Sequence, residues 1–339
     1  MLLELPSFEH IDAKSIKEAA FWLHHYGDKA RVVAGATDLL GMMKDGVKGQ
    51  KFKIPEVLVN IKTIPGMNRI TYDEATGLRI GAAGTVNQLE TSDIIKQRFN
   101  LLSQAARQIG TTQIRNMGTL GGNICQRPRC MYFRHPHFLC FKKGGAQCYA
   151  ITGEHRYYHS ILEKGRCVMA HPSDMAPVLV ALKARAIIAS SDGEKEVSLE
   201  DCFLGPNNFS ETVLESNEFL IGVRVPNQNG RAYQAFLKQR IRHAADFALS
   251  SVATVAQISN GIWEEISIIL GGVAPFPYRA SMAEDIVKGK RLDERLILGA
   301  AEASVEGAHP LPMNHYKVDL TKALVKRALT SIWDEAQKS

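Results

Sequence analysis

Cysteine is the residue type whose placement in this sequence predicts the most specific chemistry. Five of the six cysteines lie between Cys125 and Cys167, and the sixth is Cys202. Thiolates gathered in this way bind iron–sulfur clusters or zinc. The sequence contains no Cys-x2-Cys pair of the kind common in zinc sites, which favours iron. The odd number of clustered cysteines, and an N-terminus without a secretion-signal pattern, argue against disulfides.

The positive charge of the chain is concentrated in the same segment. Residues 125–167 carry eight lysines and arginines against two glutamates, an excess that equals the formal net charge of +6 of the whole chain. Cations beside an anionic cluster stabilise the cluster and its reduction. A nucleic-acid-binding protein would spread its basic residues over a groove-sized face, so this distribution argues against that class.

Two glycine-containing segments have the composition of phosphate-binding turns. Residues 32–40 read as a strand, a turn of small residues and a helix start, and residues 118–123 read as a glycine hairpin directly before the cysteines. Exposed backbone N–H groups in such turns hold a pyrophosphate or approach a flat ring. Neither segment matches a Walker loop or Gly-x-Gly-x-x-Gly. With the thiols, the two segments predict a redox protein in which a metal cluster lies beside a second cofactor.

Elements of both types must position these residues, and 339 residues suffice for two or three domains. Apolar periodicity predicts helices at 15–26, 39–44, 86–95, 101–109, 174–182, 281–288, 292–306 and 320–338. Ser15 would cap the first of them and Gly27 would end it, and Pro177 would lie in the first turn of the helix at 174–182. It predicts strands at 30–34, 57–61, 78–82, 186–190, 219–225, 231–240, 250–259 and 265–271. The dipeptide Asn260-Gly261 predicts a hairpin, and the polar turn at 226–230 a domain boundary. No apolar run reaches the roughly 18 residues that span a bilayer.

Several of these segments resemble those of a known family. Residues 34–40 and 115–123 resemble the two FAD-binding loops in the flavoprotein subunit of molybdenum hydroxylases. That family includes xanthine dehydrogenase, carbon monoxide dehydrogenase and aldehyde oxidoreductases. The similarity continues in order through His-Pro-Ser-Asp-Met-Ala-Pro at 171–177, Phe-Leu-Lys-Gln-Arg at 236–240 and Leu-Gly-Gly-Val-Ala-Pro at 270–275. The resemblance therefore covers nearly the whole chain.

The resemblance implies an α+β chain with the FAD-binding fold of the vanillyl-alcohol-oxidase/PCMH type. Residues 1–226 would form the FAD-binding domain, with two α/β subdomains at about 1–62 and 63–226 and a [4Fe-4S] insertion at about 124–168. Residues 231–339 would form a C-terminal domain with a small antiparallel sheet and helices.

The resemblance also assigns FAD contacts to positions of this chain. The first loop would wrap the pyrophosphate, the second loop would form another wall, and a few further residues match contact positions elsewhere. The implied contacts are Val33, Ala34, Gly35, Ala36, Thr37, Asp38, Leu39, Leu40, Thr111, Gly118, Thr119, Gly121, Gly122, Asn123, Asp174, Leu220 and Lys238. Ala36 stands where many relatives have a second glycine, and an alanine fits there only if its φ angle stays negative.

The cysteine segment is an insertion, because most family members pass directly from the second FAD loop to the Ser-Asp motif. It resembles the [4Fe-4S] loop of 4-hydroxybenzoyl-CoA reductase. Through Gln-Arg-Pro-Arg-Cys-Met-Tyr-Phe-Arg at 126–134, it resembles most that of one group of bacterial aldehyde oxidoreductases. The resemblance puts the ligands at Cys130, Cys140, Cys148 and Cys167. A second set, with Cys125 in place of Cys167, stays open, because four thiolates ligate a cubane at many loop spacings.

The resemblance implies the electron-transfer subunit of a heterotrimeric molybdenum aldehyde dehydrogenase. FAD would receive electrons from [2Fe-2S] centres of a small partner subunit and pass them to an external acceptor, while a large partner subunit would bind the molybdopterin cofactor. No catalytic side chain is expected in this chain. Alternatives are a subunit of xanthine dehydrogenase or 4-hydroxybenzoyl-CoA reductase type, a stand-alone flavin oxidase, and a zinc-stabilised binding module. The expected location is the cytoplasm, or the periplasm by co-export with a signal-bearing partner.

Overall fold

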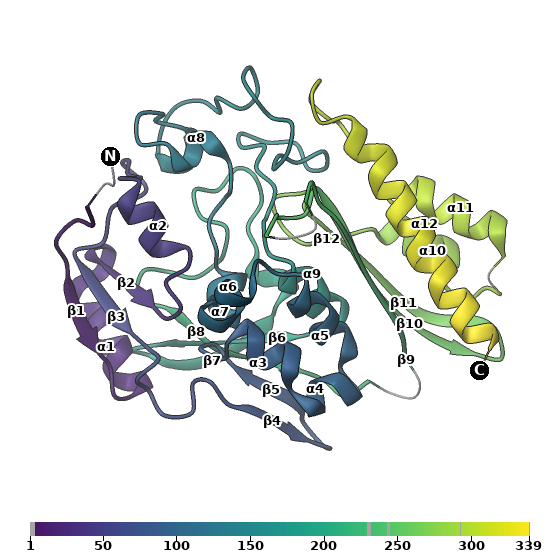
Figure 1. Ribbon diagram of the computed structural model, residues 1–339, viewed down its shortest axis with the longest axis horizontal. Helices are drawn as coiled ribbons and strands as arrows, with labels where there is room; N and C mark the ends of the chain where they lie inside the picture. Colours follow the sequence, from purple (N-terminus) through teal and green to yellow (C-terminus); the bar gives the residue numbers. More distant parts are fainter. Residues whose placement is uncertain (1–3, 229–231, 243–244, 292, 339) are drawn as a thin grey trace.

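Three β-sheets with helices packed against them make up the protein (Figure 1). The computed structural model describes residues 4–228, 232–242, 245–291 and 293–338. Within these ranges no helix has the length and apolar character needed to cross a membrane. The predicted boundary at 226–230, and the predicted starts at 231 and 292, fall partly on residues outside the described ranges.

The N-terminal sheet is parallel and carries the first glycine segment. Its strand order is β1 (Glu9–Asp12), β3 (Val57–Asn60) and β2 (Ala30–Val33). α1 (Ile16–Tyr26) packs against β2 and β3 and is joined to β2 by η1 (Gly27–Lys29). Ser15 caps α1 by accepting a hydrogen bond from the N–H of Glu18, and Gly27 at φ +52° ends it, as predicted. The helix α2 (Leu39–Lys44) follows the segment with its predicted bounds.

The central sheet is antiparallel and forms the floor of the molecule in Figure 1. Its strand order is β4 (Ile70–Asp73), β5 (Gly77–Gly81), β8 (Phe219–Val225), β6 (Arg185–Ser190) and β7 (Gly193–Ser198). η3 (Glu200–Cys202) follows β7. The helices above it are α3 (Val86–Thr91), α4 (Asp93–Arg98), α5 (Asn100–Arg107) and α9 (Met175–Ala181). Pro177 lies in the first turn of α9, as predicted, where its missing N–H costs no hydrogen bond.

One expectation for this region is wrong, and two of its strands, β4 and β7, are not among the predicted ones. The single helix predicted at 86–95 is two helices, because the chain is extended at Ser92 (φ −60°, ψ 125°). Thr91, Ser92 and Asp93 all carry short polar side chains that compete with helical backbone hydrogen bonds, which explains the break. The edge strand β7 was not predicted at all, since its residues are mostly charged and exposed and give no apolar alternation.

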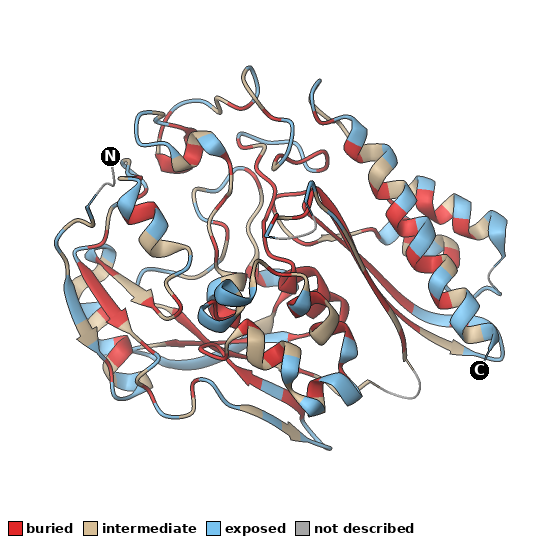
Figure 2. Ribbon diagram, in the orientation of Figure 1, coloured by how far each residue is buried: buried red, intermediate tan, exposed pale blue. Residues whose placement is uncertain are grey.

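The C-terminal sheet is antiparallel, with the order β12 (Tyr278–Arg279), β11 (Ile262–Gly271), β10 (Ser250–Ser259) and β9 (Ala232–Gln239). Asn260 and Gly261, at φ +51° and +76°, form the predicted hairpin turn between β10 and β11. The C-terminal helices α10 (Ser281–Val287), α11 (Glu294–Ala303) and α12 (Tyr316–Gln337) cover one face. α5 and α9 contact the other face, so the sheet is buried between two helical layers (Figure 2).

The second glycine segment is helical, so the predicted hairpin at 118–123 is wrong. α6 (Thr112–Met117) and α7 (Leu120–Ile124) follow one another, each capped by a threonine. Thr111 accepts a hydrogen bond from the N–H of Ile114, and Thr119 accepts one from the N–H of Gly122. The two glycines of α7 disfavour a helix, but the threonine caps stabilise the helix starts by more than the glycines cost.

The cysteine segment is mostly irregular and lies at the top of Figure 1, between the N-terminal sheet and the C-terminal helices. Its regular parts are α8 (Met131–Arg134) and η2 (Phe141–Lys143). The fully buried Lys317 of α12 anchors it by donating hydrogen bonds to the carbonyls of Tyr157 (3.2 Å), His159 (2.8 Å) and Gly272 (2.5 Å). Burial lowers the pKa of Lys317 to about 7, while these three carbonyls stabilise its protonated form.

Candidate functional site

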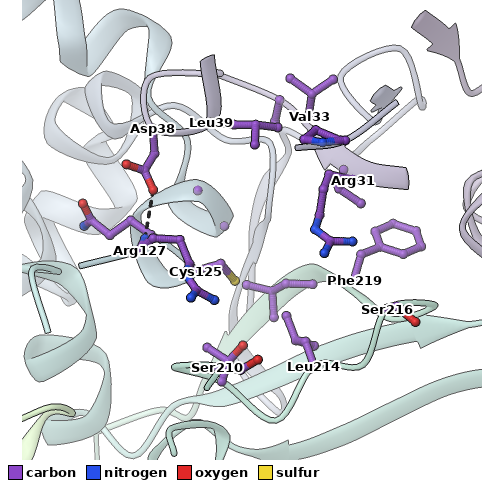
Figure 3. A pocket seen from close by; sticks show the side chains of 18 of the residues that line it. Arg31, Val33, Asp38, Leu39, Cys125, Arg127, Ser210, Leu214, Ser216 and Phe219 are labelled. Carbon is purple, nitrogen blue, oxygen red and sulfur yellow. Dashed lines mark hydrogen bonds between the residues drawn. The ribbon is translucent and has the colours of Figure 1, made fainter. Parts of the chain in front are cut away.

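Both glycine segments line one pocket of about 620 Å³, the size of a cofactor site (Figure 3). Of the predicted FAD contacts, the pocket includes Val33, Ala34, Gly35, Ala36, Thr37, Asp38, Leu39, Thr119, Gly121, Gly122 and Leu220. The predicted contacts outside its lining are Leu40, Thr111, Gly118, Asn123, Asp174 and Lys238. The pocket thus joins the end of β2 and the start of α2 to the capped start of α7.

Gly35 brings the two glycine segments into direct contact. A Cβ atom on Gly35 would lie 2.9 Å from the carbonyl carbon of Met117, still closer to its oxygen, and 3.0 Å from the Cα of Gly118. Real Cβ atoms do not approach backbone atoms so closely, so only glycine fits here. At Gly35 the two segments therefore pack backbone against backbone, beside the pocket that both line.

Ala36 adopts the left-handed conformation, with φ +59°. The expectation that an alanine fits here only at negative φ is therefore wrong. A non-glycine residue in this region costs about 1–2 kcal/mol, so the loop holds strain at the pocket wall. Ala36 itself lines the pocket, so this left-handed residue lies where the first segment faces the cavity.

Replacing Ala36 with glycine is expected to stabilise the protein by about 1 kcal/mol, because glycine adopts positive φ without a steric penalty. The free energy of unfolding in denaturant measures the effect. Ala34→Gly is the matched control, since Ala34 has no positive φ and glycine there only increases the entropy of the unfolded chain. Equal losses in both variants would contradict strain at Ala36.

Asp38 connects the first loop to the cysteine segment. Its Oδ2 accepts a hydrogen bond from the backbone N–H of Arg127 (2.9 Å). Its Oδ1 forms ion pairs with Arg134 (2.6 Å) and Arg129 (2.9 Å). The negative charge of Asp38 is thereby balanced, which favours an anionic ligand in a pocket that this carboxylate lines.

A buried ion pair lies outside the pocket, beside α9. Lys238 Nζ donates to Asp174 Oδ2 (2.6 Å) and to the carbonyl of Gln108 (3.1 Å). Burial raises the pKa of Asp174, and Lys238 opposes that rise. Asp174 Oδ1 is buried and has no hydrogen-bond partner. Asn123 reaches the same region, because its Oδ1 accepts a hydrogen bond from Ser173 Oγ (2.6 Å).

Four cysteines of the inserted segment line a second, small cavity of about 10 Å³, the room of roughly one water molecule. They are Cys130, Cys140, Cys148 and Cys167. Aromatic and apolar side chains, Tyr132, Phe133, Phe141, Tyr149 and Met169, form most of the remaining wall. Among the described residues, no three His, Cys, Asp or Glu side chains are grouped closely enough to hold a single metal ion.

The sulfurs in this cavity receive hydrogen bonds and face buried cations. Backbone N–H groups of Tyr132 and Phe133 lower the pKa of Cys130, although burial raises it overall to about 12. The buried Lys143 lowers the pKa of Cys140, again against a larger effect of burial. His159 Nε2 lies 3.3 Å from Cys130 Sγ. Burial lowers the pKa of His159 to about 4, so its ring is neutral at pH 7.

The other two cavity cysteines share a hydrogen bond. The thiol of Cys167 bonds to Cys148, which lowers the pKa of Cys148 and raises that of Cys167. The buried Lys142 opposes the rise at Cys167. Lys142 itself pairs with the buried Glu211 (3.1 Å). Sequence reasoning missed Glu211, because it does not lie within a recognisable pattern.

Cys125 lies on the wall of the large pocket rather than in the cysteine cavity. Burial and the neighbouring Cys202 raise its pKa to about 12, so its thiol is protonated at neutral pH. The second ligand set, with Cys125, therefore combines thiols from two different cavities.

Comparisons with known proteins identify the family of the chain. Residues 6–228 match the family described as FAD binding domain in molybdopterin dehydrogenase, and residues 235–332 match CO dehydrogenase flavoprotein C-terminal domain. The aldehyde oxidoreductase FAD-binding subunit PaoB of Escherichia coli is 30% identical over 91% of this chain and 92% of its own length. The glyceraldehyde dehydrogenase medium chain of Sulfolobus acidocaldarius is 28% identical over 96% of this chain and 99% of its own.

A solved structure has the same fold. The matching chain in the structure of carbon monoxide dehydrogenase from Hydrogenophaga pseudoflava has a TM-score of 0.77 and 28% identity, covering 98% of this chain and 99% of that one. The predicted α+β fold, with sheets and helices of this type, is confirmed. The two family matches and the relatives extend over nearly the whole chain. The chain therefore belongs to the FAD-binding medium subunits of the molybdenum hydroxylase family, and is an oxidoreductase subunit.

Proposed function

We propose that this chain is the electron-transfer flavoprotein subunit of a molybdenum-containing aldehyde oxidoreductase. The observation that carries the proposal is the pocket of about 620 Å³ lined by both glycine segments. Bound FAD supplies one- and two-electron transfer, between [2Fe-2S] centres of a small partner subunit and an external acceptor. A large partner subunit would hold the molybdopterin cofactor. Relatives named as an aldehyde oxidoreductase subunit and a glyceraldehyde dehydrogenase chain favour an aldehyde as the substrate of the complex.

The residues of this chain would bind and orient the cofactor. Backbone N–H groups at 35–38 and at the start of α7 would hold its pyrophosphate, since both stretches line the pocket. Leu220 would pack against it from β8. The unpartnered Asp174 Oδ1 is a buried acceptor without a donor in the protein, which supports a role for Asp174 and Lys238 at the flavin end. No proton transfer by a side chain is required.

We also propose that Cys130, Cys140, Cys148 and Cys167 hold a [4Fe-4S] cluster. Their number, their common cavity, the N–H groups at their sulfurs and the buried Lys142 and Lys143 all suit an anionic thiolate-bound cluster. The cavity is small as it stands, so the side chains around it would move outward around a cubane. Zinc is the alternative for the same four thiolates.

Cofactor content tests the proposed function. The full chain, purified with its partners under anaerobic conditions, is expected to contain about one FAD and about four irons with equal acid-labile sulfide. If the protein contains one zinc and no acid-labile sulfide, the four cysteines form a structural zinc site and not an iron–sulfur cluster. Protein without flavin would contradict the central proposal. Co-purification of a molybdopterin-binding and a [2Fe-2S] subunit tests the proposed heterotrimer.

Replacing Cys167 with serine is expected to lower the iron content from about four per chain to below one, because one thiolate of the set is lost. Cys125→Ser is the matched control and is expected to keep its iron. Iron and sulfide assays on the FAD-containing protein measure both. Iron lost from the Cys125 variant but kept in the Cys167 variant would establish the alternative set.

A further inference from the structure

Two arginines reach into the large pocket from opposite sides (Figure 3). Arg31 comes from β2. Its Nη1 donates to the carbonyls of Ala30 (2.7 Å) and Asp28 (3.3 Å). Arg127 comes from the cysteine segment and its guanidinium lies over the rings of Phe52 (4.9 Å) and Phe133 (5.0 Å). Neither residue was among the cofactor contacts expected from the sequence.

The two guanidinium groups repel one another. Burial lowers the pKa of Arg31, the nearby Asp28 raises it, and Arg127 lowers it further. Among the described residues, no carboxylate forms an ion pair with Arg31, whereas Arg127 pairs with Glu211 (2.9 Å). Like charges held across one pocket are stabilised by an anion between them.

Three of the five acidic residues that line the pocket already have cationic partners. Glu211 is already shared by Arg127 and Lys142, and Glu218 pairs with Lys195. Asp38 is bound by three arginines of the cysteine segment, as described above. Lys51 and Lys53 also line the pocket and add further positive charge, with Asp28 and Glu215 as the remaining acids.

We infer that Arg31 and Arg127 bind the pyrophosphate of FAD and make the pocket select phosphate-bearing flavins. Guanidinium groups form charge-assisted hydrogen bonds to phosphate oxygens, often in pairs. Because Arg127 belongs to the cysteine segment, that segment is part of the dinucleotide site as well as the lining of its own cavity. The inference rests on the proposed binding of FAD.

The test compares FAD with riboflavin, which lacks phosphate. Dissociation constants are measured by flavin fluorescence with the full chain after removal of its cofactor. Arg31→Met and Arg127→Met are each expected to weaken FAD binding about 10- to 100-fold, since each removes a charge-assisted contact. Riboflavin binding is expected to stay unchanged. Arg79→Met is the matched control, an exposed strand arginine outside the pocket.

Each result decides a separate question. If a variant loses affinity for FAD and riboflavin equally, the substituted arginine only supports the fold. If neither affinity changes, that arginine does not contact the phosphates. Wild-type protein that binds neither flavin would overturn the proposed function itself. If a methionine variant fails to fold, competition on the wild type decides: ADP is expected to displace FAD and adenosine is not. Equal competition by both would overturn the inference.

Discussion

Gly35→Ala is expected to empty the FAD pocket. The new Cβ would overlap the carbonyl group of Met117, and both atoms of that group belong to backbone that cannot rotate away. The two glycine segments would have to separate, so the walls of the pocket would no longer meet. We expect the bound FAD per chain to fall more than tenfold, which the ratio of flavin to protein absorbance measures.

Gly41→Ala is the matched control for this prediction. Gly41 lies only six residues further along, inside α2, and a Cβ there would have nothing within 4 Å. Alanine is a better helix former than glycine by about 1 kcal/mol, so this variant is expected to keep its FAD and gain stability. A Gly35 variant that retains FAD and melts like the wild type would contradict the contact between the two segments.

Lys238→Met is expected to lower the free energy of unfolding by about 3–5 kcal/mol, because it leaves Asp174 buried without its cation. Chemical denaturation monitored by circular dichroism measures the loss. Lys183→Met is the control, since Lys183 pairs with Glu265 at 2.8 Å but 65% of its side chain is exposed. That pair is expected to contribute no more than about 1 kcal/mol.

The loss caused by Lys238→Met is also expected to depend on pH. With Lys238 gone, burial alone raises the pKa of Asp174 further above its ordinary value. A carboxyl whose pKa is higher in the folded state binds protons on folding, so its cost grows as pH rises above about 3.9. The difference from the wild type is therefore expected to be largest near pH 7 and to shrink toward pH 4. A difference independent of pH would mean that Asp174 is not ionised beside Lys238.

Signals between neighbouring residues are enough to predict where some helices begin or end and where one hairpin turns. The cap at Ser15, the stop at Gly27 and the Asn260-Gly261 turn act through hydrogen bonds or φ angles of nearby residues, and the structure confirms all three. The apolar and glycine patterns give wrong or missing elements where they are weak. The charged edge strand β7 has no apolar face, and the threonine caps of α6 and α7 outweigh the neighbouring glycines, which by themselves predict a turn.

The sequence predicts the parts of the site in which the residues lie close together along the chain. Both glycine segments line one pocket, and four of the clustered cysteines line one cavity. The partners that set their electrostatics lie far away in sequence: Arg31 faces Arg127 across the pocket, and Lys142 pairs with Glu211. A single sequence holds no signal for such pairs, because they depend on how three sheets pack. The roles of Asp174, Lys238 and the remaining predicted contacts stay predictions.

The hydrogen bonds from Lys317 to the cysteine segment can form only late in the synthesis of the chain. Lys317 follows Cys167 by about 150 residues, which a ribosome adding roughly 5–20 residues per second needs about 8–30 s to synthesise. During that interval the carbonyls of Tyr157 and His159 have no ammonium to bind. We expect the thiols of the cysteine segment to stay accessible in nascent chains until the last helix emerges. Pulsed alkylation of ribosome-bound chains, arrested before and after α12, would measure when that window closes.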